Sequence, residues 1–373
     1  MSLLFTPLSL RGITLPNRVV ISPMAQYCAE DGCATPFHFV HLAAFANGGA
    51  GLVFTESTKV ERRGLGSFGD LCLWNEAHVQ ALRPVTRFIK EAGAVPGIQL
   101  NHSGRKARSQ RPWEGFGPLQ GSDEDLWPVI APSAIAHAEG WATPREMTAA
   151  DIREMIGMWA ASARLAVEAG FEVLEIHGAH GYLVHQFLSP KANQRSDQYG
   201  GSLSNRMRFA LELTEAVRDA WPEHLPLFFR VSATDGMGWE LEDTVTLAAA
   251  LRDRGVDVID CSSGGMATRS PTASGQALSP GYQVPYAERV RHEAGVATMA
   301  VGLIVEPEHA EQILREDRAD LIAIGREALY DPFWARHAAQ TLGHEKGFAS
   351  WPRQYAWWLE RRAQAQAGIS RKR

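Results

Sequence analysis

The sequence is short of cysteine, of net basic charge and of long apolar runs, and each shortage excludes a class of protein. Four cysteines in 373 residues, without zinc or iron–sulfur spacing, argue against a disulfide framework and predict reduced thiols. A formal net charge of −5 leaves no basic field for nucleic acid. No stretch reaches the roughly 18 apolar residues of a membrane span, and the start of the chain shows no charged leader before an apolar core. We therefore expect a cytoplasmic protein with small-molecule partners and no nucleic-acid or membrane partner.

Apolar strand patterns alternate with helical patterns along most of the chain. Eight such repeats predict a single (β/α)8 TIM barrel over residues 1–373. The length of the chain agrees, since this fold takes roughly 250 residues plus insertions. Pro7, Gly12 and Pro16 with alternating apolar residues predict an N-terminal hairpin that closes the bottom of the barrel. The expected strands are 19–24, 51–56, 95–100, 171–177, 226–231, 257–261, 296–301 and 320–325, and the clearest helices are 36–47, 76–92, 149–169, 203–220 and 242–254.

Two segments depart from this alternation. Residues 102–147, after the third strand, are rich in Gly, Pro and Trp without a helical period, and a connection of this length usually forms a lid or binding loop. We expect them to form an active-site loop, followed by a helix capped at Thr148. Residues 344–373 form a C-terminal extension that contains the aromatic stretch SWPRQYAWWLERR.

The fourth strand carries the densest group of reactive side chains. It ends on His177, and His180 and Tyr182 follow within five residues, at the strand end where α/β folds bind ligands. Two histidines at i and i+3 could belong to a zinc-dependent barrel hydrolase, which would need further ligands. Neither a Cys-x-x-Cys nor a His-Glu-x-x-His supplies them, and we expect no metal site.

The last two strand ends predict a phosphate site. Gly302 follows the seventh strand and Gly325-Arg326 the eighth, where barrels bind phosphate through backbone N–H groups and a fixed positive charge. Arg230 and Gln99 in the barrel mouth could hydrogen-bond a planar heterocycle, although Arg230 could instead pair with Glu175 or Asp260. A phosphate and a heterocycle together indicate bound flavin mononucleotide (FMN).

Four motifs make the chain resemble a known family. SPMAQY, IQLNHSGRKA, EIHGAHGYLVHQFLSPKANQRSDQYGGSLSNR and AIGREALYDP are similar to the Old Yellow Enzyme family of flavin-dependent ene-reductases, and the His-x-x-His pair to its thermophilic-like, or xenobiotic-reductase, branch. Yeast-type members carry His-x-x-Asn. The resemblance implies that FMN is held by Ser22, Pro23, Met24, Ala25, Ser57, Gln99, Arg230, Gly302, Gly325 and Arg326. Ala25 departs from the pattern, because the branch usually has Cys there.

The resemblance also implies a reaction. NADPH or NADH would reduce FMN in a ping-pong cycle, and the flavin would then pass hydride to the activated C=C bond of an α,β-unsaturated carbonyl or nitro compound. His177 and His180 would bind the substrate oxygen, Tyr182 would donate the proton, and Tyr27 and Trp358 would contact the substrate. In some members the matching C-terminal segment lends an aromatic side chain to the site across a dimer interface, so we expect a homodimer or higher homo-oligomer. The segment could instead be a cap on the core. The alternatives are an FMN-dependent 2-hydroxy-acid oxidase and the zinc hydrolase. The oxidase would need a base histidine after the seventh strand, and this sequence has none directly after Gly302.

Overall fold

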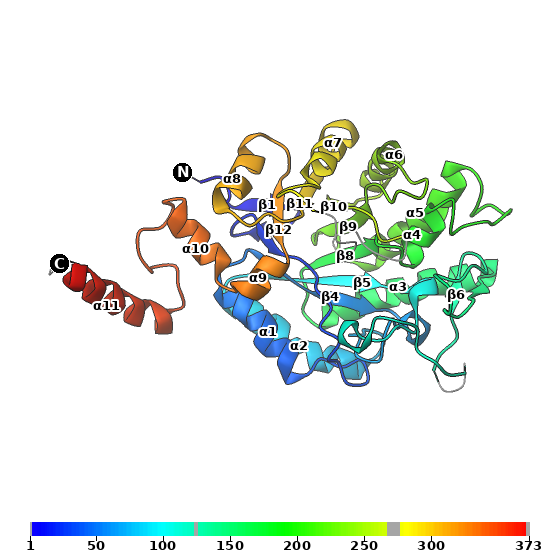
Figure 1. Ribbon diagram of the computed structural model, residues 1–373, viewed down its shortest axis with the longest axis horizontal. Helices are drawn as coiled ribbons and strands as arrows, with labels where there is room; N and C mark the ends of the chain where they lie inside the picture. The colour runs from blue at the N-terminus through cyan, green and yellow to red at the C-terminus, as the bar shows by residue number, and fades with distance from the viewer. Residues whose placement is uncertain (1, 123–125, 267–276, 371–373) are drawn as a thin grey trace.

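The structure, a computed structural model, describes residues 2–122, 126–266 and 277–370, so the C-terminal Arg-Lys-Arg lies outside the described residues. Eight parallel strands close into a barrel, which confirms the predicted fold (Figure 1). Around the barrel the strands follow the order β3-β4-β5-β8-β9-β10-β11-β12, so each strand pairs with the next one along the chain. Their bounds are β3 Val19–Ile21, β4 Leu52–Lys59, β5 Val95–Asn101, β8 Val173–Gly178, β9 Leu227–Ser232, β10 Val258–Ser262, β11 Ala297–Val301 and β12 Leu321–Ile324.

The predicted hairpin is present and closes one end of the barrel. Strands β1 (Leu8–Leu10) and β2 (Ile13–Leu15) pair antiparallel. Leu10 and Leu15 join an apolar cluster with Phe54 and Phe228 from the barrel strands, so the amino-terminal end of the barrel is filled with side chains. Any ligand must therefore bind at the opposite, carboxyl end of the strands.

Helices cover the outside of the barrel and bury a second apolar layer against its strands. Helices α1 and α5 have the predicted bounds, and α3 begins behind Thr148, whose Oγ1 accepts from Asp151 N at 3.1 Å. Figure 1 shows the last helix, α11, beyond α10 and away from the barrel. The helices are α1 Pro36–Asn47, α2 Glu76–Glu91, α3 Ala149–Glu168, α4 Leu183–Leu188, α5 Leu203–Ala220, α6 Leu241–Arg252, α7 Val284–Ala294, α8 Pro307–Arg315, α9 Arg326–Tyr330, α10 Trp334–Thr341 and α11 Arg353–Ser370.

Several details differ from the expectation. The second barrel strand runs to Lys59, three residues beyond its expected end at residue 56. The first barrel strand stops at Ile21 rather than residue 24, because Pro23 has no N–H to continue the ladder. Residues 102–147 are mostly irregular, as predicted, but they contain two short 3₁₀ turns, η2 (Gly104–Lys106) and η3 (Pro112–Glu114), and two short paired strands, β6 (Ile130–Ala131) and β7 (Arg145–Glu146). The loop packs through its own small core around Trp127, which is 1% exposed.

Candidate active site

Two cavities open at the carboxyl end of the strands, and His180 lines both. The first, of about 490 Å³, is bounded by Gly302 and Gly325 and is called here the glycine cavity. The second, of about 350 Å³, is bounded by Tyr27 and Tyr182 and is called the tyrosine cavity. Because one side chain lies on the wall of each, an extended ligand could occupy both spaces at once.

The glycine cavity has the features of an anion site. Arg326 lines it and forms no ion pair with any described residue. A side chain at Gly302 would lie 3.0 Å from Gln283 Nε2, and its φ of +125° also favours glycine, so the backbone is bare at this point. Ser22 lies beside Gly325, and its buried hydroxyl has no hydrogen-bond partner. A buried hydroxyl without a partner is costly unless a ligand completes it.

The predicted flavin contacts Gln99 on β5 and Arg230 on β9 lie on either side of β8, each with a carboxyl partner. Arg230 Nε is 3.0 Å from Asp260 Oδ2, which is one of the ion pairs considered from the sequence. Gln99 Nε2 donates to Glu175 Oε1 at 2.7 Å. Burial, together with the charge of Asp260, raises the pKa of Glu175 to about 8. Arg230 also lines the glycine cavity, so the ion pair does not remove it from ligand contact.

The reactive side chains of the fourth strand meet at the tyrosine cavity: His180 and Tyr182 line it, and His177 packs against both of their rings. The rings of His177 and His180 have centroids 5.1 Å apart, and the rings of His177 and Tyr182 have centroids 5.0 Å apart. Burial, and then nearby positive charge, lowers the pKa of both His177 and His180 well below the usual value. Both imidazoles are therefore neutral at neutral pH, and each carries one N–H donor.

The hydrogen bonds of the two imidazoles assign their protons. His177 Nδ1 accepts from Ala179 N at 3.2 Å, so the neutral ring carries its proton on Nε2, for which no described residue is a partner. Ser262 Oγ donates to Val231 O at 2.9 Å and thus accepts from His180 Nε2, also at 2.9 Å. The arrangement leaves His177 Nε2 as the donor that is free to bind a ligand oxygen.

Side chains form hydrogen bonds with the backbone of the turn that carries His180. His180 has a left-handed φ of 56°, which costs energy in a residue with a Cβ. Its N–H donates to Ser232 Oγ at 2.9 Å, and its carbonyl accepts from Lys106 Nζ at 2.8 Å. The next peptide is held the same way, because Gly181 N donates to His185 Nδ1 at 2.9 Å and Gly181 O accepts from Gln186 Nε2 at 2.7 Å.

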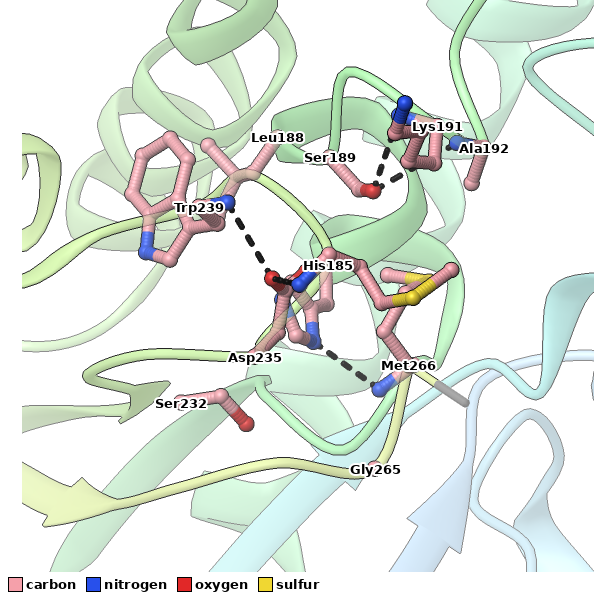
Figure 2. Close-up of polar contacts among 12 residues, drawn as sticks. His185, Leu188, Ser189, Lys191, Ala192, Ser232, Asp235, Trp239, Gly265 and Met266 are labelled. Carbon is pink, nitrogen blue, oxygen red and sulfur yellow. Dashed lines mark hydrogen bonds and ion pairs between the residues drawn. The ribbon is translucent and has the colours of Figure 1, made fainter. Parts of the chain in front are cut away.

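His185 is itself fixed by a buried carboxylate (Figure 2). Its Nε2 lies 3.4 Å from Asp235 Oδ2, and both side chains are completely buried. Asp235 Oδ1 accepts from Met237 N at 2.6 Å and from Trp239 N at 3.1 Å, so the carboxylate cannot move independently. A carboxylate behind an imidazole sets the orientation and tautomer of the ring. This pair therefore positions the turn between His180 and Tyr182.

Nine of the fifteen predicted site residues line these cavities, and six do not: Ser22, Pro23, Met24, Gln99, His177 and Trp358. Ala25, Tyr27 and Ser57 line the tyrosine cavity, and Met24 lies next to Gly325. Gln99 is buried below the cavities, and Pro23 is half-buried in the loop after β3. Trp358 is 66% exposed on α11, so it does not reach the site of its own chain.

Sequence reasoning left other lining residues out of the predicted site. Ser263 binds Gln283 Oε1 at 2.8 Å on the wall of the glycine cavity. Lys59 and Lys106 both reach the ring of Tyr182, with Nζ 5.4 Å and 5.5 Å from its centroid. Basic residues at two strand ends were a signal for them, but only the structure shows that their amines converge. Asp70, Ser103, His137 and Trp141 complete the tyrosine cavity.

Within residues 2–122, 126–266 and 277–370, no three His, Cys, Asp or Glu side chains are grouped so that they could hold a metal ion. No helix there is long and apolar enough to cross a membrane.

A parallel barrel with an arginine-bearing glycine cavity beside two neutral imidazoles and a phenol has the architecture of a flavin-dependent oxidoreductase. Comparisons with known proteins identify the family. Residues 3–345 match the model of the NADH:flavin oxidoreductase / NADH oxidase family, the Old Yellow Enzyme family, and the chain belongs to it. It is 45% identical to the NADPH dehydrogenase of Geobacillus sp. (strain WCH70) over 346 residues, which cover 92% of this chain and 95% of that one.

Solved structures agree with the fold. The Old Yellow Enzyme homologue from Zymomonas mobilis has a TM-score of 0.75 at 23% identity, with 91% of this chain and 92% of that chain covered. Morphinone reductase has a TM-score of 0.76 at 25% identity, with 91% and 90% covered. The protein is thus an oxidoreductase that uses FMN, with NADPH or NADH as reductant.

The residues present fit FMN. Arg326 and the bare backbone at Gly302 and Gly325 suit a phosphate, and the unpartnered Ser22 hydroxyl and the Arg230 guanidinium suit the polar parts of the cofactor. Ala25 lines the tyrosine cavity, and its side chain has no polar group that could hydrogen-bond a bound flavin.

Proposed function

We propose that the protein reduces the activated C=C bond of α,β-unsaturated carbonyl compounds, and of nitroalkenes, with NADPH or NADH in a ping-pong cycle. One observation carries the proposal: the ring of His177, with its free N–H, packs against the ring of Tyr182, and Tyr182 lines a cavity that meets the glycine cavity at His180. FMN supplies the hydride. The structural similarity to a protein named as the reductase of morphinone supports this choice of reaction.

His177 binds the substrate oxygen and polarises the alkene. Its Nε2–H is free, and its Nδ1 is fixed by Ala179 N, so the donor is oriented before substrate arrives. His180 reaches the same oxygen when its Nε2 exchanges Ser262 Oγ for it. Negative charge that develops on the oxygen is then stabilised in a site with little water.

Tyr182 donates the proton to Cα. Its ring is enclosed by protein but keeps part of its surface open to the tyrosine cavity. Burial raises the pKa of Tyr182, and Asp70 acts in the same direction, whereas the charge of Lys59 lowers it. The phenol therefore holds its proton at neutral pH and releases it only to a strong base such as the carbanion at Cα.

Tyr182→Phe tests the proposal, because this variant keeps the ring and removes the donor. Reduction of bound FMN by NADPH should be unchanged in stopped flow, whereas reoxidation by 2-cyclohexenone should slow by a factor on the order of 10²–10⁴. Unchanged enone reduction would assign the proton to another donor or to water.

A nitroalkene provides the internal control. Addition of hydride to it gives a nitronate that is stable enough to leave unprotonated, so its reduction should slow much less in Tyr182→Phe. Equal slowing with both substrates would show that Tyr182 positions the substrate rather than donating a proton.

We also propose that the protein is a homodimer in which α11 contacts the second copy. Tyr355, Trp357 and Trp358 are 44%, 47% and 66% exposed on this one helix, which is unusual for large aromatic side chains on a free surface. Trp358 then contributes to the substrate contacts of the partner. Deletion of residues 353–373 should give a monomer by sedimentation and raise the KM for the enone, and a dimer that persists would contradict the assignment.

A further inference from the structure

Lys59 is a buried cation on the wall of the tyrosine cavity whose role the proposed reaction leaves open. It is the last residue of β4, and its side chain is 4% exposed. Its Nζ donates to Ser57 Oγ at 2.9 Å, lies 3.5 Å from Asp70 Oδ2 and lies 5.4 Å from the centroid of the Tyr182 ring.

The surrounding groups hold this ammonium in one place. A buried positive charge is unfavourable without a counter-charge, which Asp70 supplies. Asp70 Oδ2 is fixed in turn by Gly66 N at 2.7 Å and Ser67 N at 3.2 Å. Asn101 Nδ2 donates to Ser57 Oγ at 2.8 Å, so the acceptor of the lysine is fixed as well. The ammonium is therefore rigidly held against one phenol.

A proton donor in such a cavity has a specific need. When Tyr182 gives up its proton it becomes an anion in a site that shields it from water, and a positive charge a few ångströms away is then much more effective than it would be in solvent. The other titratable groups near the ring are His177, His180 and Tyr27, which are neutral, Lys106, and Asp70, whose charge raises the pKa of Tyr182 but has a smaller effect than the charge of Lys59, which lowers it.

Lys106 is the weaker candidate for this role. Burial, and then the charge of Arg105, lowers the pKa of Lys106 to about 7, so its amine is only partly charged at neutral pH. Its protons also serve the structure, because Nζ donates to the carbonyls of His180 and Gly265. Lys59, by contrast, has the carboxylate of Asp70 beside it.

We propose that Lys59 is a positioning residue for proton transfer: held by Asp70 and Ser57 against the ring of Tyr182, it stabilises the phenolate that forms when Tyr182 protonates the substrate. The inference rests on the proposed function. In that step the alkene takes hydride at Cβ from the reduced cofactor and a proton at Cα from Tyr182. The O–H bond breaks as the C–H bond forms, and the phenolate regains a proton from water.

The test compares Lys59→Met, which keeps the length of the side chain and removes the charge, with Lys59→Arg, which keeps the charge. In the FMN-loaded enzyme, Lys59→Met should slow reoxidation by 2-cyclohexenone by a factor on the order of 10, which corresponds to about one unit in the pKa of the donor. Reduction of the flavin by NADPH and reoxidation by a nitroalkene should not change. Lys59→Arg should restore most of the enone rate.

The pH profile is a readout that a purely structural role would not move. The enone rate falls at high pH as Tyr182 loses its proton, and removal of the nearby positive charge should shift this fall to higher pH. In addition, Lys59→Met should have no further effect when it is combined with Tyr182→Phe, because the two residues act through the same proton.

The outcomes separate this inference from the proposed function. If Tyr182→Phe slows the enone reaction but Lys59→Met leaves it and the pH profile unchanged, the role of Lys59 is wrong and the proposed function stands. Equal slowing with enone and nitroalkene would also overturn it, because Lys59 would then position substrate. If Tyr182→Phe itself has no effect, the proposed donor fails first. Flavin absorbance and a thermal melt check that each variant folds, and Lys59→Gln carries the same test if Lys59→Met does not.

Discussion

The glycine cavity and the tyrosine cavity share His180 but are built in different ways. The glycine cavity is bounded by the ends of adjacent strands β9 to β12, and bare backbone and two arginines are its main features. The tyrosine cavity is bounded by side chains from β4, from the loop after β5 and from the turn after β8, which only the closed barrel brings together. The comparison shows that one site is specified by the barrel and the other by contacts between distant segments.

The two cavities also differ in how their charges are balanced. Arg326 has no carboxylate partner in the described part of the chain, so the glycine cavity offers its charge to a ligand. In the tyrosine cavity, Lys59 is paired with Asp70, and Lys106 binds backbone carbonyls. The first cavity is thus suited to hold an anion, and the second to stabilise charge that exists only during the reaction.

Among the changes that compare the two cavities, Arg326→Ala should give the largest effect, and it would test the anion site. Loss of a charge-assisted contact costs about 1.5–3 kcal/mol, so FMN affinity should fall by a factor of roughly 10–150 and the purified variant should be mostly apoprotein. The ratio of flavin to protein absorbance measures this. The control is Arg289→Ala, which removes an arginine that pairs with Glu242 and Glu293 on the surface and should retain its flavin. A full complement of FMN in Arg326→Ala would make Arg326 structural.

His177→Ala should have an intermediate effect, confined to the tyrosine cavity. The variant loses one neutral hydrogen bond to the ligand oxygen, worth about 0.5–1.5 kcal/mol, so phenols and enones should bind roughly 2–10 times more weakly while FMN stays bound. Titration of the long-wavelength absorbance that a phenol produces over the oxidised flavin measures the affinity. If the variant binds the phenol as tightly as the wild type, the assignment of His177 as the donor to the ligand oxygen is wrong.

The smallest effect concerns pH. Because burial lowers the pKa of His177 well below 6.5, the unfolded state binds a proton below pH 6.5 that the native state does not. Above pH 6.5, His177 therefore has no effect on how the free energy of unfolding changes with pH. Below pH 6.5, it lowers the free energy of unfolding as the pH falls. His177→Asn should reduce that loss by about 1.4 kcal/mol per pH unit at most. Urea unfolding at pH 7.5 and pH 5.5 with excess FMN measures it, and an identical acid loss in both proteins would show that His177 is charged when folded.

The residues at the carboxyl ends of the strands could be predicted from the sequence, whereas some other residues that line the tyrosine cavity could not. The parallel ladder places His177 opposite Arg230 and Arg230 opposite Asp260, so residues that end a buried strand must meet at one face. Lys59 was missed for a physical reason: the register shifts between Phe54 and Ser57, so simple alternation does not show which way its side chain points. Helix α4 was missed because its six residues are all buried and show no amphipathic period.

The left-handed backbone at His180 limits which residues can replace it. With φ at 56°, asparagine, aspartate and histidine are the non-glycine residues that adopt this conformation most readily, whereas a β-branched residue would be strained there. Asparagine can therefore replace His180 by a single substitution that leaves the backbone of the turn in place, whereas threonine cannot. The backbone of a single turn, rather than the chemistry of the reaction, thus limits which side chains can stand at the position proposed to bind the substrate oxygen together with His177.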